Sequence, residues 1–264
     1  MHLPKNYLRK IWRAVMEFEM IFPHDKVMVG LSGGKDSMFL LYALKTMQKY
    51  SPFPFQLSAA TIDLGYGNIE QDYLAEYCQR LEVPFYLEKT QIAQVVAKTS
   101  PDNPCSSCAF YRRGALATIC KKKEYNLLAL AHHQDDAIET FILSLFYSGQ
   151  LKTFRPTSNL DRSGLRVIRP LVYFTEAEVK GALKYTDSKA VKNPCPYAGN
   201  TKREHVKTFL KELVKENPNV YTHLLSAMRE GKKIELWPPK ATKEEMQQRY
   251  KRFMGKIDKN EKQM

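Results

Sequence analysis

The sequence predicts an α/β fold: a doubly wound parallel sheet with an N-terminal helix and a C-terminal helical extension. Short apolar runs alternate with longer stretches whose apolar residues recur every three or four positions, which is typical of strands alternating with helices. A glycine-rich turn at 31–37 joins the first apolar run to the first long apolar helix. Because strand–helix–strand crossovers are right-handed, this order gives a parallel sheet with helices on both faces.

The expected elements follow one another without an internal repeat. An amphipathic helix is predicted at 5–20, where Ile11 and Val15 have helical spacing. Strands are expected at 27–30, 56–64, 83–87 and 126–131, and a short extended piece at 166–171. Helices are expected at 36–50, 69–81, 91–98, 109–123, 137–147, 203–216 and 219–230, and after the capping residue Thr175.

Three parts are expected from these boundaries: an N-terminal helix (1–22), a main α/β domain (23–185) and a basic helical extension (186–264). The stretch from Gly149 to the extended piece at 166 has loop character, because basic and turn-forming residues dominate it. The tail after Trp237 is predicted to be a charged helix or disordered.

The turn at 31–37 has the composition of an anion-binding loop. Two adjacent glycines, Gly33 and Gly34, let the backbone approach a ligand and point several N–H groups at it. The helix that follows adds free N–H groups and the positive end of its dipole. The spacing is not that of the ordinary P-loop, which has four residues between its first Gly and Gly-Lys-Ser/Thr. The residues expected to hold a phosphate are Leu31, Ser32, Gly33, Gly34, Lys35, Asp36 and Ser37.

The composition favours a soluble protein with a polyanionic partner. Of the 264 residues, 44% are hydrophobic and 26% are charged, as in ordinary globular proteins. No apolar stretch approaches the ~20 residues that span a bilayer, so no membrane partner is expected. The N-terminus has no secretory pattern, and a cytoplasmic protein is predicted. The formal net charge of +13 favours nucleic acid as a partner, because a small anion alone would not require it.

Carboxylates follow two of the expected strands. Asp63 ends the second strand, and Asp135 and Asp136 follow the fourth, three and four residues after His132. Ligands of open α/β sheets bind at the carboxyl ends of the strands, so these side chains are expected to meet the ligand of the turn. Carboxylate oxygens suit Mg²⁺, and Asp136 with Asp36 is the expected pair of ligands. Asp63 has a second possible role as a helix cap.

The five cysteines do not predict disulfides, because their number is odd and a reducing compartment is expected. The Cys105-x-x-Cys108 pair alone fits zinc, redox or iron–sulfur chemistry, and no second pair follows it, as zinc fingers usually require. With Cys195 the chain offers three thiolates, which suit a 4Fe-4S cluster with one open iron. Three reduced structural cysteines are the alternative. Cys78 and Cys120 have apolar neighbours and are expected in the core.

The turn resembles, residue for residue, the SGGKDS signature of the PP-loop (N-type) ATP pyrophosphatases. This resemblance implies an adenine-nucleotide α-hydrolase-like fold and cleavage of ATP to AMP and pyrophosphate. Further motifs occur in the order found in the tRNA 2-thiocytidine synthetases, which are related to the tRNA 2-thiouridine synthetases. These motifs are Pro104-Cys105-x-x-Cys108, Arg112-Arg113-Gly114, His133-Gln134-Asp135-Asp136, Ile168-Arg169-Pro170-Leu171 and Pro194-Cys195.

The second resemblance implies ATP-dependent thiolation of a tRNA pyrimidine at carbon 2, with cytidine favoured. It implies ATP, Mg²⁺ and a 4Fe-4S cluster on Cys105, Cys108 and Cys195, together with a sulfur donor such as a cysteine desulfurase or free sulfide. A homodimer and a target base in the anticodon loop are also expected. Lys35 would hold the β- and γ-phosphates. Arg113 would contact the α-phosphate or lie on the tRNA side.

Several alternatives stay open at this point. Asp135 is either an acid–base residue or an orienting one, and Ala131 stands where the superfamily usually has Gly. The single cysteine in Cys195-Pro196-Tyr197 resembles the 2-thiouridine branch. Lysidine-type or amide-forming ligation, or a non-catalytic tRNA-binding sulfur carrier, would use the same fold. Residues 152–169 and 189–203 are the expected contacts to the RNA backbone, because they are basic and irregular.

Overall fold

The computed structural model describes residues 1–67, 70–101, 104–160, 164–191, 194–197, 199, 201–229 and 239–254. Sequence expectations that involve residues 69, 161, 162, 192, 193, 230 and 237 therefore lie partly outside the described residues. The chain divides into two compact units, 1–228 and 229–264. The second unit contains the helix α10 (Lys243–Phe253). Among the described residues, no helix combines the length and apolarity that a membrane crossing needs.

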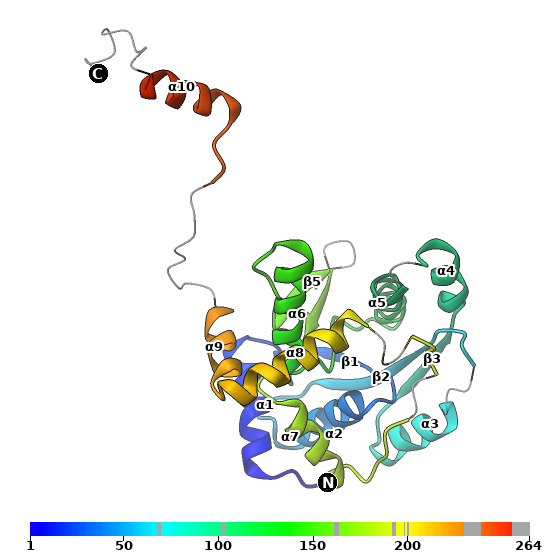
Figure 1. Ribbon diagram of the computed structural model, residues 1–264. Coiled ribbons are helices and arrows are strands. Elements are labelled where there is room, and N and C mark those ends of the chain that lie inside the picture. The colour runs from blue at the N-terminus through cyan, green and yellow to red at the C-terminus, as the bar shows by residue number, and fades with distance from the viewer. Residues whose placement is uncertain are drawn as a thin grey trace. The chain divides into compact units, whose positions relative to one another are not determined.

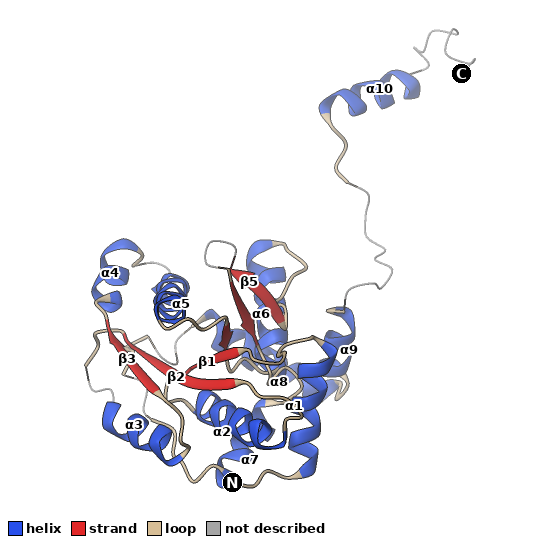
Figure 2. Cartoon of the chain, turned by 180° about the vertical axis from the view of Figure 1, so that it is seen from behind, coloured by secondary structure: helices blue, strands red, loops and turns tan. Residues whose placement is uncertain are grey.

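A mostly parallel sheet forms the centre of the first unit (Figures 1 and 2). Its described strands lie in the order β3-β2-β1-β4-β6-β5, and only β5 runs antiparallel to its neighbour. The chain builds β1, β2 and β3 outwards and then returns to place β4 on the other side of β1, as a doubly wound sheet does. The strands are β1 (Lys26–Gly30), β2 (Gln56–Asp63), β3 (Phe85–Lys89), β4 (Leu127–Ala129), β5 (Thr157–Leu160) and β6 (Leu165–Ile168).

Helices cover both faces of this sheet (Figure 2). One face carries α1 (Lys5–Glu17), α2 (Lys35–Tyr50), α3 (Gln71–Arg80) and α7 (Glu176–Ala182), which is followed by the short 3-10 helix η1 (Leu183–Tyr185). The other face carries α4 (Ile92–Thr99) and α5 (Pro104–Lys122). A third apolar cluster joins α6 (Gln134–Ser148), α8 (Lys202–Glu216) and α9 (Val220–Ala227).

The two faces are built from alternate residues of the same strands. Val27 and Val29 of β1 pack into the α1–α2–α3–α7 core, whereas Met28 between them packs towards α5. This is the period of two that a strand imposes on its side chains. Both faces are apolar because both are covered by helices, which is typical of parallel sheets.

The predicted fold class is confirmed, with two local corrections. The helix expected at 109–123 begins at Pro104, because proline fits the first turn of a helix and does not break it there. The two cysteines of the Cys-x-x-Cys pair thus lie on a helix. The loop expected before residue 166 contains the edge strand β5, which pairs with β6. The cap at Thr175 is confirmed: its side chain accepts from Glu178 N, and the Glu178 carboxylate accepts from Thr175 N.

Candidate active site

A cavity of about 340 Å³ opens at the carboxyl ends of β1, β2 and β4. Its walls come from the turn after β1, the end of β2, the segment after β4, and α5. Two residues from the segment between η1 and α8, Val191 and Pro194, complete the lining. Of the residues expected to contact a nucleotide, the lining includes Leu31, Ser32, Gly34, Asp36, Ser37, Asp63, His132 and Asp136.

The turn after β1 is held in shape by its own serines. The backbone N–H of Ser32 donates to Ser37 Oγ over 3.1 Å, and Ser37 Oγ donates to the carbonyl of Gly34 over 3.0 Å. The two serine hydroxyls lie 3.1 Å apart. These bonds hold the turn closed at the start of α2, where unpaired N–H groups and the helix dipole favour an anion. The turn is therefore organised for a phosphate before any ligand arrives.

Residue 33 must be glycine, because another segment of the chain packs against the turn at this position. Its φ is +79°, and a Cβ at this position would lie 2.9 Å from Val191 Cβ. The backbone N–H of Val191 donates to the Gly33 carbonyl over 2.8 Å. The segment that leads to Cys195 is thus fixed to the phosphate turn, and a side chain at residue 33 would push it away.

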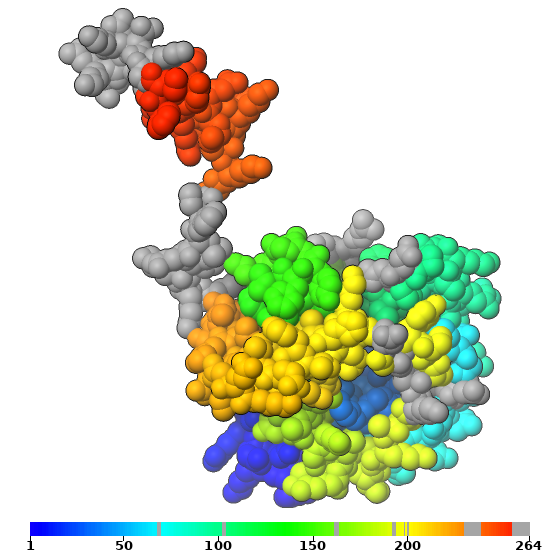
Figure 3. All heavy atoms as spheres, viewed as in Figure 1, coloured from blue at the N-terminus to red at the C-terminus, as the bar shows by residue number. Residues whose placement is uncertain are grey.

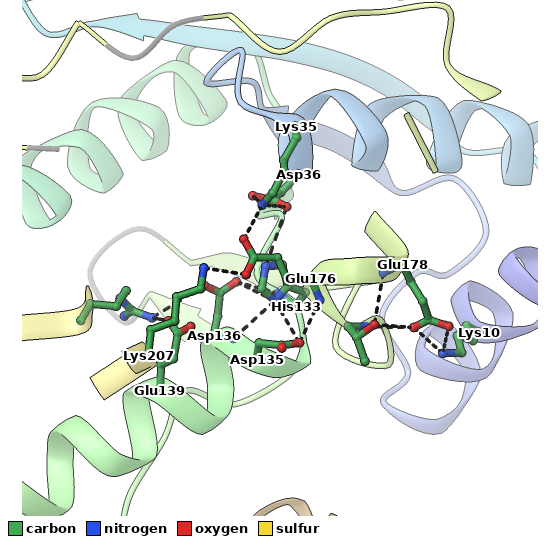
Figure 4. Close-up of polar contacts among 12 residues, drawn as sticks. Lys10, Lys35, Asp36, His133, Asp135, Asp136, Glu139, Glu176, Glu178 and Lys207 are labelled. Atoms are coloured by element: carbon green, nitrogen blue, oxygen red, sulfur yellow. Dashed lines mark hydrogen bonds and ion pairs between the residues drawn. The ribbon is translucent and has the colours of Figure 1, made fainter. Parts of the chain in front are cut away.

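Lys35 is not among the residues that line the cavity, and its ammonium lies in an ion cluster (Figure 4). Its ammonium lies 2.8 Å from Asp36 Oδ1 and 3.2 Å from Glu176 Oε1. Glu176 also accepts from Lys207, over 2.6 Å. Burial opposes charge on Lys35, but the bond to Asp36 and the charge of Glu176 outweigh it, so the pKa of Lys35 is raised. In Figure 3, α2 (blue) is visible between α8 (yellow) and α7 (yellow-green), where these groups meet.

Glu176 has the largest pKa shift in this cluster. Burial alone would raise its pKa, but the hydrogen bond from Lys207 and the charge of Lys35 lower the pKa to about 2. Its backbone N–H donates to Asp135 Oδ2 over 2.9 Å. Glu176 therefore connects the first turn of α2, the start of α6 and the middle of α8. The sequence indicated only that Glu176 begins a helix, and nothing in it indicated Lys207.

His133 begins α6 and arranges the carboxylates around it. His133 is 4% exposed. Its Nδ1 accepts a hydrogen bond from the backbone N–H of Asp136, and its backbone N–H donates to Asp136 Oδ2. Its Nε2 lies 3.8 Å from Asp36 Oδ1, and its Nδ1 lies 3.8 Å from Asp135 Oδ2. The structure brings Asp36, Asp135 and Asp136 around one imidazole. Burial raises the pKa of Asp135, and this carboxylate is outside the cavity lining.

Arg203 of α8, which the sequence did not single out, contacts two carboxylates of α6. Arg203 Nη1 lies 3.6 Å from Asp136 Oδ1 and 3.0 Å from Glu139 Oε2. Glu139 is 3% exposed, and its burial raises its pKa against the lowering effect of Arg203. The helix that follows Cys195 is thus attached to the helix that carries Asp136. Glu139 lies within the expected helix 137–147, but only the fold shows that it has a cationic partner.

Asp63 and the two arginines of α5 also have defined places. Asp63 Oδ1 accepts from Gly65 N over 2.9 Å, so this carboxylate shapes the turn after β2 while it lines the cavity. Arg112 lines the cavity, whereas Arg113 is exposed and outside the lining. Tyr66 also lines the cavity, and burial, followed by the charges of Cys195 and Cys108 and the hydrogen bond with Cys195, raises the pKa of Tyr66 to about 12.

The Cys105 and Cys195 thiols are both close enough to Cys108 to affect its pKa. Cys105 is exposed, and Cys108 and Cys195 are half-buried. Burial raises the pKa of Cys108, Arg112 lowers it, and the Cys195 and Cys105 thiols raise it further. No three His, Cys, Asp or Glu side chains in the described ranges are close enough to form a ready-made metal site. Three neighbouring thiols nevertheless match the donor set of an iron–sulfur cluster, which is ligated by thiolates. Cys78 and Cys120 are buried in the core, as expected.

Comparison with known proteins agrees with this geometry. The profile of the PP-loop domain family matches residues 5–215. The tRNA-cytidine(32) 2-sulfurtransferase of Pelobacter propionicus is 38% identical over 83% of this chain and 82% of its own length. The enzyme of the same name from Geobacter sulfurreducens is 37% identical over 85% of this chain and 89% of its own.

A similar fold occurs in the U34-tRNA thiolase NcsA from Methanococcus maripaludis, solved with its [4Fe-4S] cluster. The TM-score is 0.71 at 23% identity, covering 90% of this chain and 83% of NcsA. At this identity the likeness shows the fold. The matches in sequence extend over most of both proteins, and the chain belongs to the PP-loop family and, within it, to the family of the tRNA-cytidine(32) 2-sulfurtransferases.

Proposed function

We propose that this protein uses ATP to replace the carbon-2 oxygen of a tRNA cytidine with sulfur. The observation that carries the proposal is the hydrogen bond between Val191 and Gly33, with Pro194 in the cavity wall. It joins the phosphate turn to the chain that leads to Cys195. The proposed ATP site and the proposed sulfur site would therefore be neighbours, as thiolation requires. The relatives named tRNA-cytidine(32) 2-sulfurtransferase support cytidine as the target.

The first chemical step would activate the base. The carbon-2 oxygen of the pyrimidine attacks the α-phosphate of ATP, an O–P bond forms, and pyrophosphate leaves. The N–H group of Gly33 and those of the first turn of α2 would stabilise the phosphates as negative charge develops. Asp36 and Asp136, which both line the cavity, are the proposed Mg²⁺ ligands. Lys35 would reach the β- and γ-phosphates only after leaving Glu176.

The second step would replace the activated oxygen. Sulfur attacks carbon 2, and AMP leaves with the former carbonyl oxygen. Cys105, Cys108 and Cys195 would hold a 4Fe-4S cluster, as the presence of a [4Fe-4S] cluster in the NcsA thiolase supports. Such a cluster, with three thiolate ligands and one open iron, supplies a place for sulfide. Tyr66 would orient Cys195 through its hydrogen bond to that thiol. Asp135 would act as an acid–base or an orienting residue.

The remaining parts of the proposal concern the RNA and its partners. The target base must leave its stack to reach the cavity, which is easiest in the single-stranded anticodon loop. Residues 152–169 and 189–203 would contact the RNA backbone. The chain would divide by function into three parts, 1–22, 23–185 and 186–264. A cysteine desulfurase or free sulfide would supply sulfur to a cytoplasmic homodimer.

Mass spectrometry of tRNA nucleosides from cells with and without the gene tests the proposal. We expect 2-thiocytidine to disappear without the gene and to return with the wild-type gene. 2-Thiocytidine should not return with a gene that encodes Asp36→Asn, which removes a cavity carboxylate. It should return with Asp72→Asn, which changes an exposed carboxylate on α3. Loss of 2-thiouridine instead would identify the alternative pyrimidine, and unchanged thionucleosides would refute thiolation.

A further inference from the structure

Three arginines near the cavity have no carboxylate partner in the part of the chain that the structure describes: Arg112, Arg113 and Arg169. Two other arginines of the first unit differ: Arg166 lies 3.5 Å from Asp25, and Arg203 is paired with Glu139 and Asp136. An unpaired guanidinium at the surface is ordinary, but a buried one is costly without an anion.

Arg169 makes this cost most evident, because it is only 5% exposed. Its Nη1 donates to the Arg155 carbonyl over 2.7 Å, and its Nε is buried without a hydrogen-bond partner. Its guanidinium lies 5.0 Å from the centre of the Phe154 ring. Burial, together with the charge of Arg113, lowers the pKa of Arg169 to about 10, so the group stays charged at neutral pH. A buried cation whose Nε–H lacks a partner among the described residues favours an anion nearby.

His132 connects this group to the cavity. Its ring lies 5.1 Å from that of Phe154, it lines the cavity, and its Nδ1 is buried without a partner. Burial, followed by the charges of Arg169 and other arginines, lowers the pKa of His132 to about 3. The imidazole is therefore neutral, and the positive charge on this wall comes from the arginines alone.

Arg112 lies in the cavity wall near Cys108. Arg112 is one helical turn after Cys108 on α5, and its charge lowers the pKa of both Cys108 and His132. The phosphates of ATP are expected elsewhere, at the turn after β1. A base that is first adenylated and then attacked by sulfur must lie between the turn and Cys108, and its own phosphate must come with it.

We propose that Arg112, Arg113 and Arg169 form a binding site for the phosphodiester beside the target nucleotide of the RNA. This assignment rests on the proposed function. Arg112 and Arg113 are exposed and would bind the phosphate oxygens, and Arg169 adds a fixed positive charge from within the fold. The site holds the nucleotide by its backbone, so it positions the base without reading its identity.

The test measures the binding of an unmodified tRNA transcript to the full chain at several salt concentrations. Arg113→Glu should weaken tRNA binding by about tenfold or more. The slope of log affinity against log salt concentration should decrease by about one, as the loss of one phosphate contact requires. Arg9→Glu is the matched control, because Arg9 is exposed on α1 and the change in net charge is the same. Arg169→Met should weaken tRNA binding likewise, and the exposed Arg113 keeps the test decisive if the buried variant fails to fold. ATP binding without RNA should be unchanged in Arg113→Glu.

Two results would overturn the phosphate site. One is equal tRNA affinity of Arg113→Glu and Arg9→Glu while the wild type thiolates tRNA. The other is an equal loss of ATP affinity without RNA, which would assign the arginine to the nucleotide. A wild-type protein that binds and thiolates no tRNA would instead refute the proposed function as well.

Discussion

The backbone N–H of Val191 donates a hydrogen bond to the carbonyl oxygen of Gly33 over 2.8 Å. The two residues are far apart in the sequence, yet this contact closes one wall of the cavity. On the other side of the same segment, Arg203 contacts Glu139. The chain that carries Cys195 is thereby attached to the nucleotide site before and after the cysteine, so displacement of either attachment should disturb both halves of the reaction.

Gly33→Ala should therefore impair ATP binding and the sulfur site together. A Cβ would meet Val191 at 2.9 Å, and the φ of +79° is unfavourable for alanine, which alone costs about 1–2 kcal/mol. Isothermal titration with ATP and iron analysis would both show losses. Gly149→Ala is the control, because Gly149 also has a positive φ but open space around it. If both variants lose equal stability and both still bind ATP and iron as the wild type does, the contact with Val191 does not contribute to function.

Glu176→Gln should destabilise the protein in a pH-dependent way. The pKa of Glu176 lies at about 2 in the folded protein, below its ordinary value of 4.5. A depressed pKa means that the ion pairs stabilise the fold above pH 4.5 and that this stabilisation is lost as the pH falls towards 2. At neutral pH the loss in Glu176→Gln should be about 1–3 kcal/mol after allowance for partial exposure.

Denaturant unfolding at several pH values measures this effect. The difference between the wild type and Glu176→Gln should be constant above pH 5 and shrink below pH 4.5. Glu212→Gln provides a surface control, because the Glu212–Lys215 pair is largely exposed and should contribute less than about 1 kcal/mol. A difference that persists at pH 2 would mean that packing, not charge, explains the role of Glu176.

The sequence predicts the parts of this site that depend on strand ends. Asp63 follows β2 and Asp136 follows β4, and the carboxyl ends of parallel strands meet at one edge of the sheet, so both reach the cavity. The shape of the phosphate turn is equally local, because Ser32, Gly34 and Ser37 make these hydrogen bonds within the turn.

The contributions of the late helices could not be predicted in this way. Lys207 meets Glu176 only because α7 and α8 pack beside the start of α2, and no periodicity in α8 indicates this contact. The edge strand β5 was missed for a different reason. Its residues Thr157–Leu160 are mostly polar, and an edge strand buries too little surface to need the apolar pattern of the central strands.

Asp36→Asn should abolish cleavage of ATP to AMP and pyrophosphate. Asp36 lines the cavity and accepts from Lys35, and loss of its charge removes both the proposed Mg²⁺ ligand and the partner of that lysine. Chromatography of the nucleotides after incubation with tRNA, sulfide and Mg²⁺ measures the products, with Asp72→Asn as the control. Release of ADP by the wild type would contradict the reaction class, and full activity of Asp36→Asn would remove Asp36 from the site.

Replacement of the three neighbouring thiols should remove iron, whereas replacement of a core thiol should not. Anaerobically purified wild type should contain about four irons per chain, and Cys105→Ser, Cys108→Ser and Cys195→Ser should each fall below about one. Cys120→Ala is the control on the same helix as Cys105 and Cys108, because Cys120 is buried in the core. Iron and acid-labile sulfide analysis with visible absorbance provides the measurement. Cys105 and Cys108 share helix α5, whereas Cys195 comes from a later segment of the chain. Retention of iron in Cys195→Ser would therefore mean that the third ligand lies elsewhere. Stoichiometric zinc without acid-labile sulfide would contradict the cluster itself.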